Sequence, residues 1–197
     1  MAMPVTPVAR RYSVAEVLAL PADGNRYEVV HGELLVTPAP SIRHQDVAFE
    51  LAARLREYLA AVKAPCRVFM GPADYFHEDD VYVQPDALVA PAAEVSGDWR
   101  TIRHLLLVIE VVSPSSLRGD RLVKRRAYQE AGAVTYWIVD PQRRVVEVWH
   151  PADELPELVT GTLRWRCAAE APELEIPLPE LFARLPGPPS EERAAQR

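Results

Sequence analysis

The most apolar stretch of the chain is LLLVIEVV at residues 105–112, and it limits the folds that the chain can adopt. Apolar residues follow one another here without polar alternation, which is typical of a strand covered on both faces. We therefore predict a central strand over His104–Val112. Glu110 lies inside this strand, where an ionised carboxylate is costly unless it is paired or binds a metal. The alternative is that Glu110 ends the buried part of the strand and pairs with an arginine.

The rest of the chain alternates between strand and helix patterns. Apolar residues recur every fourth position from Val47 to Leu59, which predicts an amphipathic helix from Ser41 to about Ala61. The other predicted strands lie at 26–30, 33–37, 67–71, 74–77, 81–90, 134–139, 145–149 and 162–167, and the other predicted helices at 13–20, 120–131 and 179–185. This order favours an α/β (α+β) fold, a mixed β-sheet flanked by helices, with N-terminal and C-terminal β-hairpins. We expect a tail at 1–12, a single domain at 13–186 and a flexible tail at 187–197.

Composition excludes several classes of protein. With 197 residues, 49% of them hydrophobic, the chain can bury a core without disulfides. The net charge of −6 argues against broad attraction to nucleic acid, so a nucleic-acid function must depend on a local site. No run approaches the roughly 18 apolar residues that span a bilayer, and the first residues lack the apolar core of a secretory signal. We expect a cytoplasmic protein without a membrane partner. Cys66 and Cys167 are too isolated to form a zinc pattern.

Asp86 is a second misplaced carboxylate, because aspartate is unfavourable within strands. It interrupts the predicted strand at 81–90, and the preceding Pro85 cannot donate to a sheet ladder. A bulge or an edge location is therefore expected, and such a distortion often directs a side chain into a site. The alternative is a plain Pro-Asp kink.

Lys124 is conspicuous because 20 of the 22 basic residues are arginine. It follows Glu110 by a turn and the start of a helix, and a helix after a strand packs back against its sheet. Lys124 can therefore reach a carboxylate of that strand. The alternative is an exposed basic helix face, since Arg121, Arg125 and Arg126 are close in sequence.

Taken together, Asp86, Glu110 and Lys124 favour a metal-dependent hydrolytic site. Two carboxylates on neighbouring strands provide the hard oxygen ligands that suit Mg²⁺, with Mn²⁺ as a substitute. Such a metal supports phosphodiester hydrolysis, and a nearby lysine can orient water or neutralise developing charge. Arg121 and Arg125 are candidates for binding a backbone phosphate.

Five sequence blocks resemble the Uma family of restriction endonucleases within the PD-(D/E)XK nuclease superfamily. In order they are RYEVVHGELLV, PSIRHQDV, VQPDALVA, LLLVIEVVSPSS and KRRAYQEAGAVTYWIVDP, and they span about Arg26 to Trp149. The resemblance implies a restriction-endonuclease-like fold, with Pro85-Asp86 as the PD pair and Glu110 as the second acid. The usual superfamily lysine stands two residues after that acid, where this chain has Val112, and Lys124 resembles its replacement.

Further residues match the same blocks. Glu28 is among them, without an assigned role. Glu33 is expected either to line the metal site or to be solvated, and His44 to make a local hydrogen bond or act as a ligand. Tyr128 is expected to pack one turn beyond Lys124 and steady it.

Three functional hypotheses follow. The first is a Mg²⁺-dependent endodeoxyribonuclease that acts on DNA as a homodimer, with the strands at 144–167 as the dimer contact. The second is a nuclease-fold module, weak or inactive in catalysis, that binds nucleic acid or a protein partner; Val112 and the charge of −6 motivate it. The third is a hydrolase of small phosphate esters.

Overall fold

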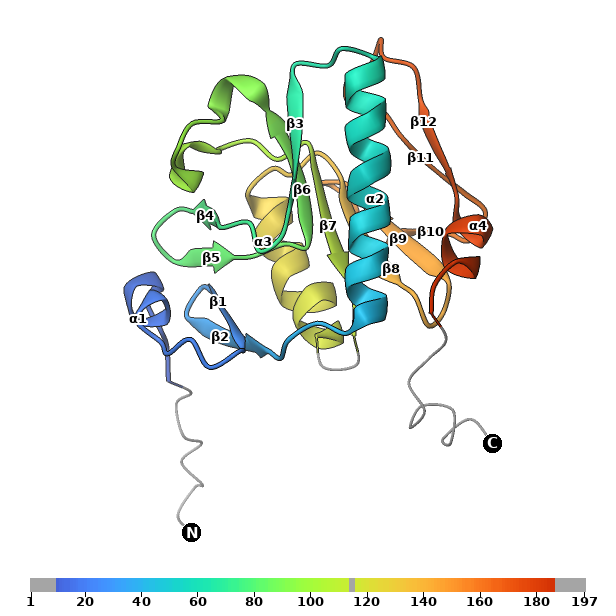
Figure 1. Cartoon of the computed structure of the whole chain (residues 1–197). Coiled ribbons are helices and arrows are strands. Elements are labelled where there is room, and N and C mark those ends of the chain that lie inside the picture. The colour runs from blue at the N-terminus through green and yellow to red at the C-terminus, as the bar shows by residue number, and fades with distance from the viewer. Residues whose placement is uncertain (1–9, 114–115, 187–197) are drawn as a thin grey trace, which may run out of the picture.

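A six-stranded sheet forms the centre of the computed structural model, which describes residues 10–113 and 116–186 (Figure 1). Its strand order is β10-β9-β8-β7-β6-β3, with β7 and β8 parallel and the other neighbours antiparallel. The strands are β3 (Cys66–Met70), β6 (Ala87–Pro91), β7 (Leu107–Val111), β8 (Tyr136–Asp140), β9 (Val145–Trp149) and β10 (Glu157–Val159). The apolar stretch that contains Glu110 thus forms an internal strand, as predicted.

Two smaller sheets complete the β-structure. The first has the order β2-β1-β5-β4, and the second pairs β11 with β12 near the C-terminal end. Their strands are β1 (Arg26–Val30), β2 (Glu33–Thr37), β4 (Tyr75–His77), β5 (Val81–Val83), β11 (Thr162–Trp165) and β12 (Leu174–Pro177). The predicted strand at 81–90 is in fact two strands in different sheets, because the chain leaves one sheet at Gln84–Asp86 and enters the other.

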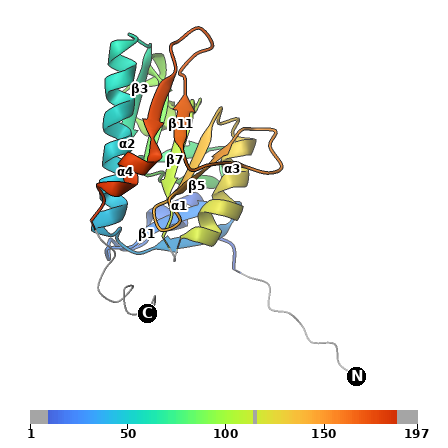
Figure 2. The same ribbon diagram turned by 90° about the vertical axis from the view of Figure 1, so that its right-hand side faces the viewer.

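Helices cover both faces of the six-stranded sheet. The long helix α2 (Ile42–Ala61) lies on one face, and α3 (Arg125–Glu130) lies on the opposite face (Figure 2). The remaining α-helices are α1 (Val14–Leu18) and α4 (Leu178–Ala183), and short 3-10 turns lie at Ala92–Glu94 and Trp99–Thr101. The chain between β7 and α3 ends with a π-helical turn at Gly119–Lys124, which the predicted helix at 120–131 did not distinguish from α-helix.

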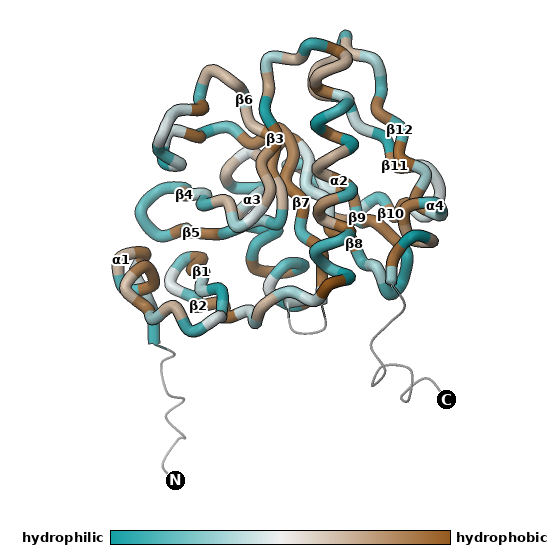
Figure 3. The backbone as a smooth tube through the Cα atoms, in the orientation of Figure 1, coloured by the Kyte–Doolittle hydropathy of each residue, from teal (hydrophilic) through white to brown (hydrophobic). Residues whose placement is uncertain are grey.

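Alternate residues of β7 point into two separate apolar clusters. Leu107, Ile109 and Val111 pack with α2, whereas Val108 and Val112 pack with the core on the α3 side. Figure 3 shows hydrophobic residues along the central strands and hydrophilic ones over much of the periphery. Because side chains alternate along a strand, Glu110 shares the α3 face with Val108 and Val112. This position brings a carboxylate beneath the π-helical turn.

The predicted fold class is confirmed, although β10 and β12 were missed. The predicted tail at 187–197 and residues 1–9 of the predicted tail at 1–12 lie outside the described residues. Two residues at the inner end of the predicted N-terminal tail contact the β1–β2 hairpin. The Tyr12 amide donates to the Gly32 carbonyl at 3.0 Å, and the Arg11 side chain donates to the His31 carbonyl at 2.5 Å. Within the part of the chain that the structure describes, no helix combines the length and apolarity needed to cross a bilayer.

Candidate active site

The segment in which the chain passes from the four-stranded to the six-stranded sheet fixes the backbone of Asp86. Its amide donates to the Ile109 carbonyl at 3.1 Å, and its carbonyl accepts from the Gly71 amide at 2.7 Å. Gly71 is required here, since a Cβ at that position would lie 2.4 Å from the Pro85 carbonyl oxygen. The predicted distortion at Pro85–Asp86 is therefore present, and it directs the Asp86 side chain into a pocket.

The Asp86 carboxylate is buried and held by three donors. Oδ2 accepts from the Val111 amide at 2.8 Å and lies 3.0 Å from His44 Nε2, while Oδ1 accepts from Arg26 Nη1 at 3.1 Å. Burial is the largest single influence on this group and acts to raise its pKa. The hydrogen bond and charge of His44, together with Arg26, outweigh it, so the pKa of Asp86 is lowered and the carboxylate is ionised.

Glu110 is almost fully buried, with 1% of its surface exposed. Its Oε1 accepts from Lys124 Nζ at 3.1 Å and from the Tyr128 hydroxyl at 3.0 Å. Burial raises the pKa of Glu110 well above its usual range; Lys124 opposes the rise, but neighbouring carboxylates add to it. Both of these contacts use Oε1, so among the described residues Oε2 has no protein donor.

Lys124 enters the site from the end of the π-helical turn. A π-turn widens the helix and is frequent at functional sites, and here it buries both Asp120 and Lys124. Lys124 Nζ lies 2.8 Å from Glu28 Oε2, 3.1 Å from Glu110 Oε1 and 3.2 Å from Asp120 Oδ1. Desolvation acts to lower the pKa of Lys124, but the three carboxylates outweigh it and raise the pKa, so the ammonium stays charged.

Glu28 is the site residue that sequence reasoning left without a role. It comes from β1 in the four-stranded sheet, it is fully buried, and its Oε1 accepts from the Gln84 amide at 2.6 Å. Its placement fixes the N-terminal hairpin against both Lys124 and the sheet crossing. The available signal was its alternation with Val30, because the two side chains share one face of a short strand and Val30 is buried.

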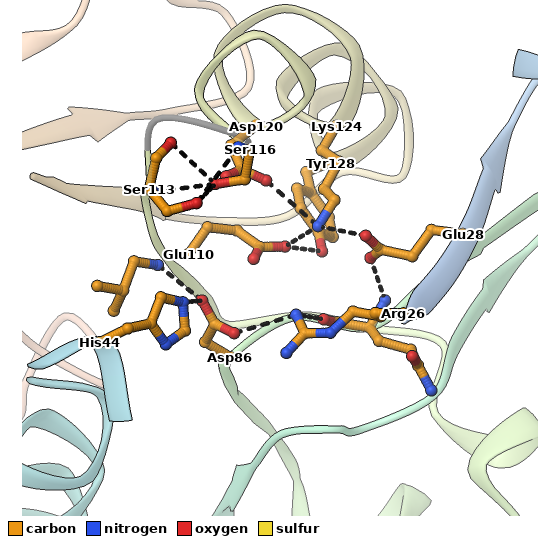
Figure 4. Close-up of polar contacts among 12 residues, drawn as sticks. Arg26, Glu28, His44, Asp86, Glu110, Ser113, Ser116, Asp120, Lys124 and Tyr128 are labelled. Atoms are coloured by element: carbon orange, nitrogen blue, oxygen red, sulfur yellow. Dashed lines mark hydrogen bonds and ion pairs between the residues drawn. The ribbon is translucent and has the colours of Figure 1, made fainter. Parts of the chain in front are cut away.

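Most of these side chains line one pocket of about 200 Å³, whereas Glu28 and Tyr128 lie behind its wall (Figure 4). The pocket opens between the N-terminus of α2, the end of β7 and the turn between β8 and β9. Its polar lining residues are Arg26, Thr37, Ser41, Arg43, His44, Asp86, Glu110, Ser113, Ser116, Asp120, Lys124 and Gln142. Val112, at the usual superfamily lysine position, also lines the pocket, and the Lys124 ammonium reaches the same space from the helix.

Five of the eight predicted site residues come together. Asp86, Glu110, Lys124 and His44 line the pocket, and Tyr128 contacts Glu110 from behind it.

The other three lie elsewhere. Glu33 is exposed, 3.7 Å from Arg118, and does not line the pocket. Arg121 pairs with Asp140 at 3.3 Å and with Glu147 at 2.6 Å, so its charge is compensated locally. Arg125 stacks over the Trp149 ring at 4.6 Å and donates to Gln129 at 2.7 Å. Neither arginine reaches the pocket that contains the carboxylates.

The donor set suits a hard divalent cation. Within the contact network, four carboxylates meet only two permanent cations, Arg26 and Lys124. The carboxylates therefore outnumber these two cations, Glu110 lines the pocket, and its Oε2 has no protein donor in the described region. Mg²⁺ commonly takes one or two carboxylates and completes its coordination with water. No group of three or more His, Cys, Asp or Glu side chains within the described residues is arranged as a ready metal cage.

Comparisons with known proteins agree with this architecture. The family model described as "Putative restriction endonuclease", Uma2, matches residues 14–179. A solved structure, described as a putative nuclease belonging to DUF820 from Anabaena variabilis ATCC 29413, is similar with a TM-score of 0.72 and 20% identity, covering 87% of this chain and 98% of that one. No curated protein matches the chain. Because the family model spans most of its length, the chain belongs to the Uma2 family, a nuclease family with a restriction-endonuclease-like fold.

Proposed function

We propose that this protein is a Mg²⁺-dependent endodeoxyribonuclease that hydrolyses DNA phosphodiester bonds. The observation that carries the proposal is the meeting of Asp86, Glu110 and Lys124 in one pocket, although they come from a sheet crossing, a central strand and a π-helical turn. Asp86 and Glu110 would hold the cation, and Mn²⁺ would substitute for Mg²⁺. When bound, the cation would stabilise negative charge on a phosphoryl oxygen and lower the pKa of a water molecule.

The protein's own residues divide the remaining work. Lys124 keeps its proton because three carboxylates surround it, so it acts as a positive charge toward the attacking water and the developing oxyanion. Glu28 and Tyr128 are positioning residues: Glu28 fixes the ammonium, and Tyr128 fixes the Glu110 oxygen that faces it. Asp86, ionised by its contacts with His44 and Arg26, provides the permanent negative charge for the cation.

DNA is favoured as the substrate by family membership and by the form of the pocket. The nuclease family points to a nucleic-acid substrate, and the pocket is lined by Arg43 as well as by Asp86 and Glu110, the two proposed cation ligands. Because the net charge of −6 gives no general attraction to a polyanion, affinity must come from this local site.

Cleavage assays test the proposal. Supercoiled, linear and single-stranded DNA are incubated with Mg²⁺, Mn²⁺ or EDTA and with the wild type, Asp86→Asn, Glu110→Gln or Lys124→Ala. We expect metal-dependent cutting that falls roughly 10²–10³-fold in each variant, as for loss of a group that stabilises transition-state charge. Lys63→Ala, at the only other lysine, is the matched control and keeps full activity. Wild type as inert as Lys124→Ala on every substrate would refute the proposal.

One observation favours the alternative of a binding module without turnover. Asp86 already has charged or hydrogen-bonding partners in Arg26 and His44, so the protein can satisfy this carboxylate without metal. Calorimetric titration with Mg²⁺ and Mn²⁺ separates the two functions. Absence of divalent-cation binding in a folded protein that still binds DNA tightly supports the module.

A homodimer is part of the proposal, because cutting both strands of a duplex requires two sites. The segment favoured for the contact contains the edge strand β10, which exposes Leu158, and the preceding turn exposes Leu155. Light scattering tests it: we expect a dimer for the wild type and a monomer for Leu158→Lys. A monomeric wild type at working concentration contradicts this part.

A further inference from the structure

Arg43 differs from the other cations that line the pocket. Arg26, His44 and Lys124 each face at least one carboxylate within ion-pair distance. Arg43 has no carboxylate partner among the described residues. Its positive charge is therefore held at the pocket wall without local neutralisation, although the site above has no role for it.

Among the residues that the structure describes, one hydrogen bond fixes the Arg43 side chain. It comes from the first turn of α2, and Nη2 donates to the Pro141 carbonyl at 2.7 Å, which ties the helix to the turn after β8. Its Nε is buried and lacks an acceptor in the described part of the chain. A buried donor without a partner is unusual in native structures. The contact with Pro141 uses one of the five N–H groups of the guanidinium, and because Arg43 lines the pocket, its other N–H groups can meet a ligand that enters there.

The chemistry of the surroundings selects the ligand. A guanidinium is a planar fork that matches phosphate or carboxylate oxygens. The N-terminus of α2 faces the same pocket, through Ser41, Arg43 and His44, and a helix N-terminus carries partial positive charge. A phosphodiester fits both ends of this pocket, since its oxygens suit the cationic wall at Arg43 and the proposed cation at Asp86 and Glu110.

We infer that Arg43 binds a backbone phosphate of the nucleic-acid strand held in the pocket, and so positions that strand for cleavage. The inference rests on the proposed function and deepens it, because it assigns a substrate-binding residue outside the carboxylate and lysine set. Arg121 and Arg125, the sequence candidates for this role, are engaged with other protein groups outside the pocket.

The test measures DNA binding by fluorescence anisotropy at several salt concentrations. Labelled single-stranded and duplex oligonucleotides are titrated in Ca²⁺, an oxygen-binding cation used in place of Mg²⁺, and gels record whether the strands stay intact. The variants are Arg43→Ala, Arg43→Lys and Arg56→Ala. Arg56 is the matched control, because it lies on the same helix and is exposed away from the pocket. Circular dichroism compares the folding of all variants, and Arg43→Lys retains the charge if Arg43→Ala folds poorly.

We expect Arg43→Ala to weaken binding about tenfold, the loss of one charge-assisted hydrogen-bonded contact. The plot of log Kd against log salt should also become shallower by about 0.9 for duplex, the slope of one phosphate contact. Arg43→Lys should recover only part of the affinity, because it lacks the planar fork, and Arg56→Ala should bind like wild type.

A methylphosphonate scan identifies the contact. Neutralising one backbone phosphate at a time should reveal a position that costs the wild type affinity but costs Arg43→Ala nothing further. The inference is overturned if Arg43→Ala binds DNA as tightly as Arg56→Ala, or if the scan reveals no such position. In either case, cleavage by the wild type leaves the proposed function intact. A wild type that neither binds nor cuts any strand overturns both.

Discussion

Replacing Lys124 by methionine should strongly destabilise the fold. The lysine side chain is 4% exposed, and its ammonium is the cation shared by Glu28, Glu110 and Asp120 at 2.8–3.2 Å. Methionine preserves much of the volume but leaves three buried carboxylates without that charge. Breaking a buried ion pair by removing one partner costs about 3–5 kcal/mol. Against a total stability of about 5–15 kcal/mol, this is a large fraction.

The loss should depend on pH, with a sign fixed by Glu110. Lys124 acts to lower the pKa of Glu110, so its removal raises that pKa further above the unfolded value. A group with a raised folded pKa contributes stability below its unfolded pKa and loses it as pH rises through the folded value. The cost of Lys124→Met should therefore be greater at about pH 8 than at about pH 5, where the carboxylates take up protons more readily.

Urea unfolding followed by tryptophan fluorescence measures this cost at both pH values. For a chain of 197 residues, about 3–5 kcal/mol corresponds to a fall in Tm of roughly 6–20 °C. Lys63→Met, at an exposed position, is the control for loss of one positive charge. Adding Glu28→Gln to Lys124→Met should recover part of the loss, because one uncompensated carboxylate is removed. Equal stability of Lys124→Met and Lys63→Met at both pH values would refute the reasoning.

Two further substitutions test the supports of the site. Gly71→Ala places a Cβ 2.4 Å from the Pro85 carbonyl oxygen. We expect a stability loss of about 1–3 kcal/mol and weaker Mn²⁺ binding by calorimetry. Wild-type stability together with wild-type Mn²⁺ affinity would contradict the close approach. His31 lies 2.9 Å from Asp80 and 2.8 Å from Glu130, and these hydrogen bonds raise its pKa. His31→Asn should lower Tm slightly at about pH 5.5 and not at about pH 9, because a raised histidine pKa stabilises only while the ring is charged. A loss that is the same at both pH values argues against protonation as its cause.

The site residues that could be predicted from the sequence are those that do not fit their local sequence pattern. Glu110 interrupts an apolar strand, Asp86 interrupts another, and Lys124 is a rare lysine on the next helix. Each feature breaks a local rule, and such breaks mark functional positions. The long helix and the central strand were likewise predictable, because the helix has a strong apolar periodicity and the strand is a nearly continuous apolar run.

The missed features depend on contacts between distant segments. Glu28 reaches Lys124 across 96 positions, from a hairpin whose carboxylates look alike in sequence, and one of them, Glu33, is exposed while Glu28 is buried. The helix arginines lie outside the pocket for the same reason: Arg121 turns to Glu147, a partner on β9 that helix spacing cannot reveal. The strand at 81–90 looked continuous because both halves are apolar, and only tertiary packing assigns them to different sheets.

The most direct test is a crystal grown or soaked with Mn²⁺ and measured for anomalous scattering. We expect one strong anomalous peak in the pocket beside the carboxylates of Asp86 and Glu110, with Lys124 still next to Glu110, and loss of that peak in Asp86→Asn. The proposed metal site would be contradicted if the folded protein showed no anomalous peak in the pocket at saturating Mn²⁺ and Asp86 remained paired with Arg26 and His44.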